Sequence, residues 1–356
     1  MTRSPKTVVP LSNGDAKRAV ARFGRSPRTA AVPLLPADVD EATWLAARRA
    51  GPDGYRVGAS EMAAVLGISP WASPFSLWWA KQDGWEAEET TRRQRYGHAV
   101  EDGIAGLFAE DRPELLVVRP GAGLWGHPVE RWLVATPDFL AVAGDVDPGW
   151  RDEGTGLTSG PLPGVHVEPV ECKSDKGGSG WGKPGTDQVP PHHRVQLLIQ
   201  CEILGAPRGW LVREEHAYRV EYDDAARAEM AHWLVEGRAF VAGLEAGVTP
   251  DIDAHEATTA TLTRLHPAVD EDTEEVLPAD LAQAYQRAHD DLDHAKARAR
   301  EVENRVRDRM GRAQHALDPD GRRIAQRLVY KRRAYEVPAG MVDQLRRKQT
   351  PTRKEP

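Results

Sequence analysis

A glutamate and a lysine stand two residues apart near the middle of the chain, as Glu171 and Lys173 in the segment PVECKS. The valines that precede them favour a β-strand, on which alternate side chains point to the same face. A carboxylate can hold a hard cation, and an ammonium group can position water and stabilise charge on a phosphate. This pair therefore fits a metal-dependent phosphodiesterase, although alternating Glu and Lys is also common on solvent-facing strands.

Two further carboxylates lie close to apolar segments. Glu101 falls in a predicted helix at 91–107, and Asp138 follows Thr-Pro at the start of a predicted strand. An apolar helix at 192–204 carries Gln196 and Gln200 on one face, and Gln196 could hydrogen-bond the lysine or its water. Three oxygen donors without thiolates or paired histidine ligands select magnesium or manganese over zinc.

The composition describes an ordinary globular chain of 356 residues, enough for one large domain with appendages or for two domains. A net charge of −7 argues against coating nucleic acid by bulk charge. The two cysteines, Cys172 and Cys201, are too few for a disulfide framework or a four-cysteine iron–sulfur cluster, which fits a reducing cytoplasm. No apolar run reaches membrane-spanning length, so we expect a cytoplasmic protein without membrane contact.

Helix-start residues and apolar runs predict the order of elements. We expect helices from Asp38 with Glu41, from Ser60 as the N-cap of 61–66, and from Ser73-Pro74 to Gly84. Short strands come next at 115–119, 123–127 and 132–135, and then a long surface loop at 143–164. The order α-β-β-β-α-β around the candidate residues predicts a mixed central sheet with the active site along one edge.

Five segments are predicted along the chain: a flexible basic arm at 1–36, a catalytic domain at 37–250, a linker at 251–277, a helical arm with a basic strand or hairpin at 278–340, and a disordered tail at 341–356. The arm at 1–36 is either a tail without function or a weak contact to a DNA backbone. A helix from 278 to about 317 carries a heptad-like seam and packs as a helical hairpin or against a partner. Residues 322–336 are either a solvated edge strand or a DNA-backbone track.

Residues 44–250 resemble the YqaJ viral recombinase family, relatives of phage lambda exonuclease among the PD-(D/E)XK nucleases. Five blocks match its motifs in order: VGASEMAAVLGISPWASPFSLWWAK, YGHAVEDGIA, ATPDFL, VECKS and VPPHHRVQLLIQCEILG. The resemblance implies an α/β (α+β) fold with a restriction-endonuclease-like core, a mixed central sheet flanked by helices. The chain departs from the pattern at Phe139, where a small residue is common, and in the length of the loop at 143–164.

The resemblance also implies roles for the candidate residues. Glu101, Asp138 and Glu171 would ligate Mg²⁺ or Mn²⁺ together with the backbone carbonyl of Cys172. Lys173 would be the catalytic lysine and Gln196 the glutamine of the last motif.

The family's phosphate-recognising residues map to Ser60, to a second hydroxyl at Thr136, and to an arginine. Arg48, Arg49 and Arg56 are available for the last position, and Arg56 is our prediction.

The function that the resemblance implies is a metal-dependent 5′→3′ exonuclease on double-stranded DNA ends. It would make single-stranded DNA for recombination, encoded by a phage or prophage and active in the bacterial cytoplasm. A single-strand annealing protein is the implied partner, and ring-forming relatives raise the question of a homo-oligomer. The alternatives are an endonuclease of the same superfamily and a non-catalytic protein that binds DNA ends.

Overall fold

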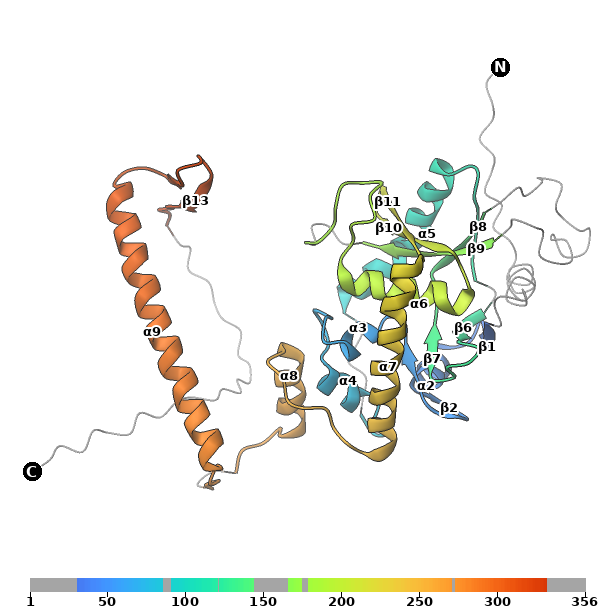
Figure 1. Ribbon diagram of the computed structural model, residues 1–356, viewed down its shortest axis with the longest axis horizontal. Helices are drawn as coiled ribbons and strands as arrows, with labels where there is room; N and C mark the ends of the chain where they lie inside the picture. Colours follow the sequence, from blue (N-terminus) through green and yellow to red (C-terminus); the bar gives the residue numbers. More distant parts are fainter. Residues whose placement is uncertain are drawn as a thin grey trace, which may run out of the picture. The chain divides into compact units, whose positions relative to one another are not determined.

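The computed structural model describes residues 31–85, 91–120, 122–143, 166–174, 179–270 and 273–331. The chain divides into two compact units, residues 1–265 and 266–356. Figure 1 shows the helices and strands of both units and labels most of them. None of the helices in the described ranges combines the length and apolar character needed to cross a bilayer.

A five-stranded mixed sheet forms the centre of the first unit, in the order β11-β10-β9-β8-β5. Its middle strand β9 (His166–Lys173) pairs antiparallel with β8 (Phe139–Ala143) and parallel with β10 (Arg208–Arg213). The outer strands are β5 (Leu116–Val118) and β11 (His216–Glu221). The helices α5 (Arg92–Asp111) and α6 (Pro191–Leu204) complete this layer in the chain order α5-β5-β8-β9-α6-β10, with two strands of a second sheet between β5 and β8. Within this sheet the order agrees with the predicted α-β-β-β-α-β.

The two helices cover opposite faces of this sheet, because successive residues of β9 point in opposite directions. Val170 and Cys172 of β9 pack in one apolar cluster with Ile104 of α5. Glu171, between them, is hydrogen-bonded to glutamines of α6. The predicted mixed sheet flanked by helices is confirmed, and it places the Glu-x-Lys face of β9 under α6.

A second, four-stranded sheet has the order β1-β6-β7-β4. It contains β1 (Val32–Pro36), β4 (Val57–Gly58), β6 (Ala122–Gly126) and β7 (Leu133–Ala135). The prediction of a flexible arm at 1–36 is wrong for residues 32–36, which pair antiparallel with β6. Proline is tolerated there because β1 is an edge strand whose register shifts beside Pro33 and Pro36. Residues 1–30 lie outside the described ranges, as do residues 144–165 of the predicted surface loop.

Capping residues explain where the first helices begin. Asp40, and not Asp38, caps α2 (Glu41–Arg49) by accepting the Thr43 N–H. The short α3 (Met62–Val65) begins after Glu61, so the prediction of Ser60 as its N-cap is wrong. Ser73 caps α4 (Pro74–Ala80) as predicted, in a capping box with Ser76, but the helix ends before Gly84.

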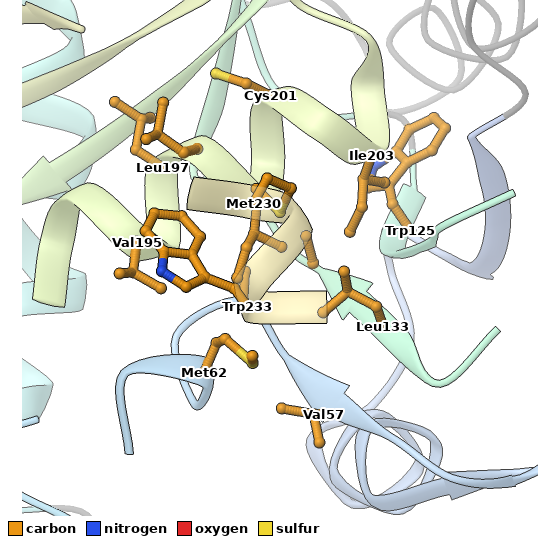
Figure 2. Packing of buried hydrophobic residues seen from close by; sticks show 14 of the residues in the cluster. Val57, Met62, Trp125, Leu133, Val195, Leu197, Cys201, Ile203, Met230 and Trp233 are labelled. Carbon is orange, nitrogen blue, oxygen red and sulfur yellow. The ribbon is translucent and has the colours of Figure 1, made fainter. Parts of the chain in front are cut away.

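The main core of the first unit lies where α7 (Asp224–Ala246) packs over α3 and α6. Figure 2 shows Met230 and Trp233 of α7 among Met62, Leu133 and Val195. These side chains come from elements far apart in sequence. The core therefore fixes β4, α3 and α6 relative to one another, and these elements border the site described below.

The domain boundary predicted at residue 250 is wrong. Residues 256–265, predicted as part of a linker, form α8 (Glu256–Leu265), which packs against α4. The buried hydroxyls of Ser73 and Thr258 lie 2.7 Å apart across this contact. The first unit accordingly extends to Leu265.

The second unit contains one long helix and a hairpin. The helix α9 (Ala279–Met310) ends at Gly311, which has a φ of 52°, rather than near residue 317. The strands β12 (His315–Leu317) and β13 (Arg323–Gln326) pair antiparallel, so the predicted basic hairpin is present but shorter. Residues 332–356, including the predicted tail, lie outside the described ranges.

Replacing Gly237 tests the packing of α7. A Cβ atom there would overlap the indole ring of Trp132, closer than any relaxed contact allows. We expect Gly237→Ala to lower the free energy of unfolding by about 1–3 kcal/mol through overpacking. The matched control is Gly106→Ala in α5, where a Cβ meets open space and a gain of up to about 1 kcal/mol is expected. Urea unfolding measures both, and an equal effect of the two changes would contradict the packing.

Candidate active site

A cleft of about 760 Å³ opens between α5, α6 and the ends of β7 and β9. Its walls combine acidic, basic and aromatic side chains with backbone of the β4–α3 turn. Eight of the nine residues predicted for the site line it: Ser60, Glu101, Thr136, Asp138, Glu171, Cys172, Lys173 and Gln196. Residues more than 130 positions apart in sequence are thus brought to one place.

Glu171 is the most enclosed carboxylate of this cleft, with 4% of its surface exposed. Its Oε1 accepts hydrogen bonds from Lys173 Nζ at 2.7 Å and from Gln196 Nε2 at 2.5 Å. Its Oε2 accepts one from Gln200 Nε2 at 2.7 Å. The sequence assigned no role to Gln200, although its spacing of four from Gln196 placed it on the same helix face.

Lys173 remains an ammonium group in this setting. Burial would lower its pKa, but the carboxylates of Glu171 and Asp138 outweigh burial and raise the pKa above its ordinary value. Its Nζ also donates to Gln196 Oε1 at 3.3 Å, so one glutamine side chain bridges the Glu171 carboxylate and the Lys173 ammonium group. A lysine held in this way donates hydrogen bonds and positive charge; it does not remove protons.

Asp138 lies directly before β8, where the strand pairing with β9 stops. Its Oδ2 accepts the backbone N–H of Cys172 at 2.8 Å. Because the N–H and C=O of one strand residue point to the same side, the Cys172 carbonyl also points toward the Asp138 side of β9. Side-chain and backbone oxygens thus converge at the end of β8.

The carboxylates repel one another. Burial raises the pKa of Asp138 well above its usual value, and the charges of Glu171 and Glu101 raise it further against the opposing effect of Lys173. Glu101 is 28% exposed, and its Oε1 lies 3.0 Å from His98 Nδ1. An excess of negative charge in a partly buried cleft is the electrostatic setting in which a divalent cation is stabilised.

The donor set fits a hard cation in type, since it consists of carboxylate and carbonyl oxygens. Among the described residues, however, no three acidic, histidine or cysteine side chains are already gathered at metal-binding spacing. Both oxygens of Glu171 are engaged by nitrogen donors. A cation that used Glu171 would have to replace at least one of these donors.

A second group of residues lies on the α2 side of the cleft. Arg48 Nη2 donates to Ser60 Oγ at 2.6 Å, and the guanidinium lies 5.0 Å from the ring centroid of Trp44. Trp44 Nε1 in turn donates to Gly123 O at 3.0 Å and to Thr136 Oγ1 at 3.3 Å. A guanidinium in contact with one hydroxyl, with a second hydroxyl in the same cleft, provides donors of the kind that recognise a phosphate.

The prediction of Arg56 as the phosphate-binding arginine is wrong in this structure. Arg56 is 7% exposed and does not line the cleft, and its Nη1 donates to Ala47 O at 2.8 Å. The cause is the small hairpin of β2 (Ala50–Gly51) and β3 (Gly54–Tyr55), which turns the chain back so that the guanidinium lies under Gly51. Arg48 occupies the cleft instead.

Glu61 forms an ion pair with Arg48. Its Oε1 lies 3.4 Å from Arg48 Nη2, and its Oε2 accepts from Lys81 Nζ at 2.7 Å and from the Gly58 N–H at 2.6 Å. Burial alone would raise the pKa of Glu61, but the charges of Arg48 and Lys81 and the hydrogen bonds lower it to about 2. This ion-pair triad holds Arg48 toward Ser60 at neutral pH.

The family model agrees with the motif blocks. Residues 43–207 match the family model of the YqaJ-like viral recombinase domain, which confirms the resemblance. Two solved structures of an alkaline exonuclease from Laribacter hongkongensis, one in complex with dAMP, are similar to this chain at 21% and 20% identity, with TM-scores of 0.39 and 0.40. Each comparison covers 64% of this chain and 100% of the other. No curated protein sequence gives a match.

The triad predicts a pH-dependent contribution of Glu61 to stability. Its folded pKa of about 2 lies below the ordinary 4.5, so the stabilisation is complete above about pH 4.5 and is lost as the pH falls toward 2. We expect Glu61→Gln to cost about 1–3 kcal/mol at pH 7 and much less at pH 3, measured by urea unfolding. Glu110→Gln, at an exposed position in α5, is the control. A cost that is the same at both pH values would contradict the account.

Proposed function

Because residues 43–207 match the YqaJ-like viral recombinase domain, we propose that this protein is a metal-dependent exonuclease that degrades double-stranded DNA ends in the 5′→3′ direction. Its product would be single-stranded DNA for phage-type homologous recombination. The family match supports a nuclease that acts on DNA. The observation that carries the chemistry is the ion pair between the buried Glu171 and the partly buried Lys173, beside Asp138.

The cation in this proposal is Mg²⁺ or Mn²⁺, held by Glu101, Asp138, Glu171 and the Cys172 carbonyl. When bound, such an ion activates water and neutralises charge on the scissile phosphate and the leaving oxygen. The raised pKa of Asp138 is consistent with this assignment, because burial and the charges of Glu171 and Glu101 disfavour its carboxylate and a bound cation would offset them.

The chain's own residues supply positioning and charge. Lys173, kept charged by its carboxylate neighbours, donates to the attacking water and stabilises the negative charge that develops on the phosphate. Gln196 accepts from Lys173 and donates to Glu171, so it fixes the lysine relative to the carboxylate. Gln200 holds the second oxygen of Glu171 and limits the rotation of that side chain.

Selection of a DNA end is assigned to the Arg48–Ser60 pair. A 5′-phosphate carries more negative charge than an internal phosphodiester, so a guanidinium next to a hydroxyl favours it. Thr136 adds a second hydroxyl in the same cleft. These contacts support an enzyme that starts at ends over an endonuclease of the same superfamily.

The remaining parts of the proposal concern partners. Double-stranded DNA ends are the substrate, a single-strand annealing protein receives the product, and the enzyme works in the bacterial cytoplasm on behalf of a phage or prophage. A homo-oligomer is compatible with this proposal. The non-catalytic alternative is disfavoured, because a protein that only bound DNA would have no need of a partly buried lysine held beside two carboxylates.

Degradation of linear duplex DNA with Mg²⁺ tests the proposed activity, with covalently closed circles compared in parallel. We expect linear DNA to be degraded and closed circles to be spared. Lys173→Ala should lower turnover about 10²–10⁴-fold with DNA binding largely retained. Lys183→Ala, at an exposed position outside the cleft, is the matched control. Cutting of closed circles would favour an endonuclease. Wild-type turnover by the Lys173→Ala variant would show that this lysine has no catalytic role.

The phosphate assignment predicts a change in end preference. Arg48→Ala should lower the ratio of rates on 5′-phosphate and 5′-hydroxyl ends about tenfold or more, since it removes a charge-assisted contact. Ser60→Ala should lower the ratio less. Arg49→Ala, the neighbouring residue paired with Asp83, should leave the ratio unchanged. If Arg48→Ala leaves the ratio of rates on the two kinds of end unchanged, the 5′-phosphate is bound elsewhere.

A further inference from the structure

Trp71 is a large aromatic side chain that lines the cleft without being part of the core. It is 68% exposed, whereas Trp78, seven residues later, is 6% exposed and packs in the main core of the first unit. Trp71 belongs to neither of the two clusters of buried apolar residues. An indole ring in this position offers a flat apolar surface to a molecule that enters the cleft.

Hydrogen bonds fix the loop that carries Trp71. The Ser69 hydroxyl accepts the N–H groups of Trp71 and Ala72, both at 3.2 Å. The Ser69 carbonyl oxygen lies 3.1 Å from His255 Nε2, and Ser73 caps α4 directly after the loop. The backbone at Trp71 is therefore held in place before a ligand binds, which reduces the entropy lost when the ring makes a contact.

Trp71 lies next to the residues proposed to hold a 5′-phosphate. Of the described residues, only Trp71 and Arg48 line both the cleft and a second groove, of about 580 Å³, between α2, α4 and α8. The indole centroid also lies 4.9 Å from the ring centroid of His192 and 5.9 Å from that of His193. These histidines belong to the first turn of α6, one turn before Gln196. Trp71 thus borders the cleft from Arg48 to the start of α6.

A nucleobase is the ligand that fits this position. A base is separated from its own 5′-phosphate by one sugar, so a phosphate on the Arg48–Ser60 pair brings the base of the same nucleotide close to Trp71. The rings of His192 and His193 are inclined to the indole by 85° and 40°, so neither forms a parallel stack with it. On the basis of the proposed function, we propose that Trp71 stacks on the base of the 5′-terminal nucleotide of the DNA.

This contact gives the enzyme a second means of selecting an end. Inside a duplex each base is stacked on neighbours at both faces, and only the terminal base has a face that no neighbouring base pair covers. An aromatic ring therefore favours a terminal nucleotide over an internal one. Every base has an aromatic face, so the contact is tolerant of sequence, as the degradation of arbitrary DNA requires.

Equilibrium binding to two linear duplexes tests the contact, with Ca²⁺ in place of Mg²⁺ so that a hard cation is present without rapid turnover. The duplexes carry a 5′-phosphate and are identical, except that one lacks the base of the 5′-terminal nucleotide. The wild type should bind the abasic end about fivefold or more weakly, the scale of one stacked base. Trp71→Ala should bind both ends equally, with the affinity of the wild type for the abasic end.

Three further variants separate stacking from other effects. Trp71→Phe keeps an aromatic face and should retain most of the difference between the two duplexes. Trp71→Leu keeps apolar bulk without that face and should lose the difference. Tyr96→Ala removes an aromatic side chain that is 49% exposed and does not line the cleft, so it should behave as the wild type. A duplex that lacks the facing base at the 3′ end controls for fraying, and its binding should not depend on residue 71.

Two results would overturn the stacking contact. One is an equal loss of affinity for the abasic end in the wild type and in Trp71→Ala. The other is a full effect of the base in Trp71→Leu, which would show an apolar contact without stacking. If the wild type degrades linear DNA from its ends but binds both duplexes equally, the stacking contact is refuted and the proposed exonuclease stands. A wild type that binds no duplex end would refute both.

Discussion

The site depends on the buried carboxylate of Glu171, which accepts hydrogen bonds from three side chains. Glu171 is enclosed under α6, and a carboxylate in that position would be costly without donors to both oxygens. Lys173 from its own strand and Gln196 and Gln200 from α6 supply them. The packing of α6 on β9 and the position of Lys173 therefore both serve to supply hydrogen-bond donors to Glu171. The same contacts stabilise the fold and arrange the residues of the site.

Charge is balanced locally rather than over the chain. The net charge of −7 would repel DNA as a whole, yet Arg48 is held in the cleft by Glu61, which Lys81 also binds. On the other wall, burial and the nearby carboxylates of Glu171 and Glu101 raise the pKa of Asp138. The cleft thus has one wall with a fixed guanidinium group and one wall with crowded carboxylates, an arrangement that the proposed metal-dependent hydrolysis of a phosphate ester would use.

Strand and helix periodicity made the wall of the cleft around Glu171 predictable from the sequence. Residues two apart on β9 share a face, and glutamines four apart on α6 meet the same carboxylate. Periodicity did not predict which of three nearby arginines enters the cleft. That choice depends on the β2–β3 hairpin, which turns Arg56 inward under Gly51, a tertiary effect with no periodic pattern. Likewise β1 forms from a proline-containing segment because β6 offers it an edge, and local propensity favoured an arm.

The central claim is that the repelling carboxylates around Asp138 are balanced by a divalent cation. The most direct measurement is the thermal unfolding midpoint of the protein as Mg²⁺ is added in the absence of DNA. The account predicts that the midpoint of the wild type rises with Mg²⁺ and that the rise is lost in Asp138→Asn, whose amide oxygen still accepts the Cys172 N–H. Asp251→Asn, at an exposed position, should respond as the wild type does. An equal rise in Asp138→Asn would contradict the assignment of this carboxylate to the cation.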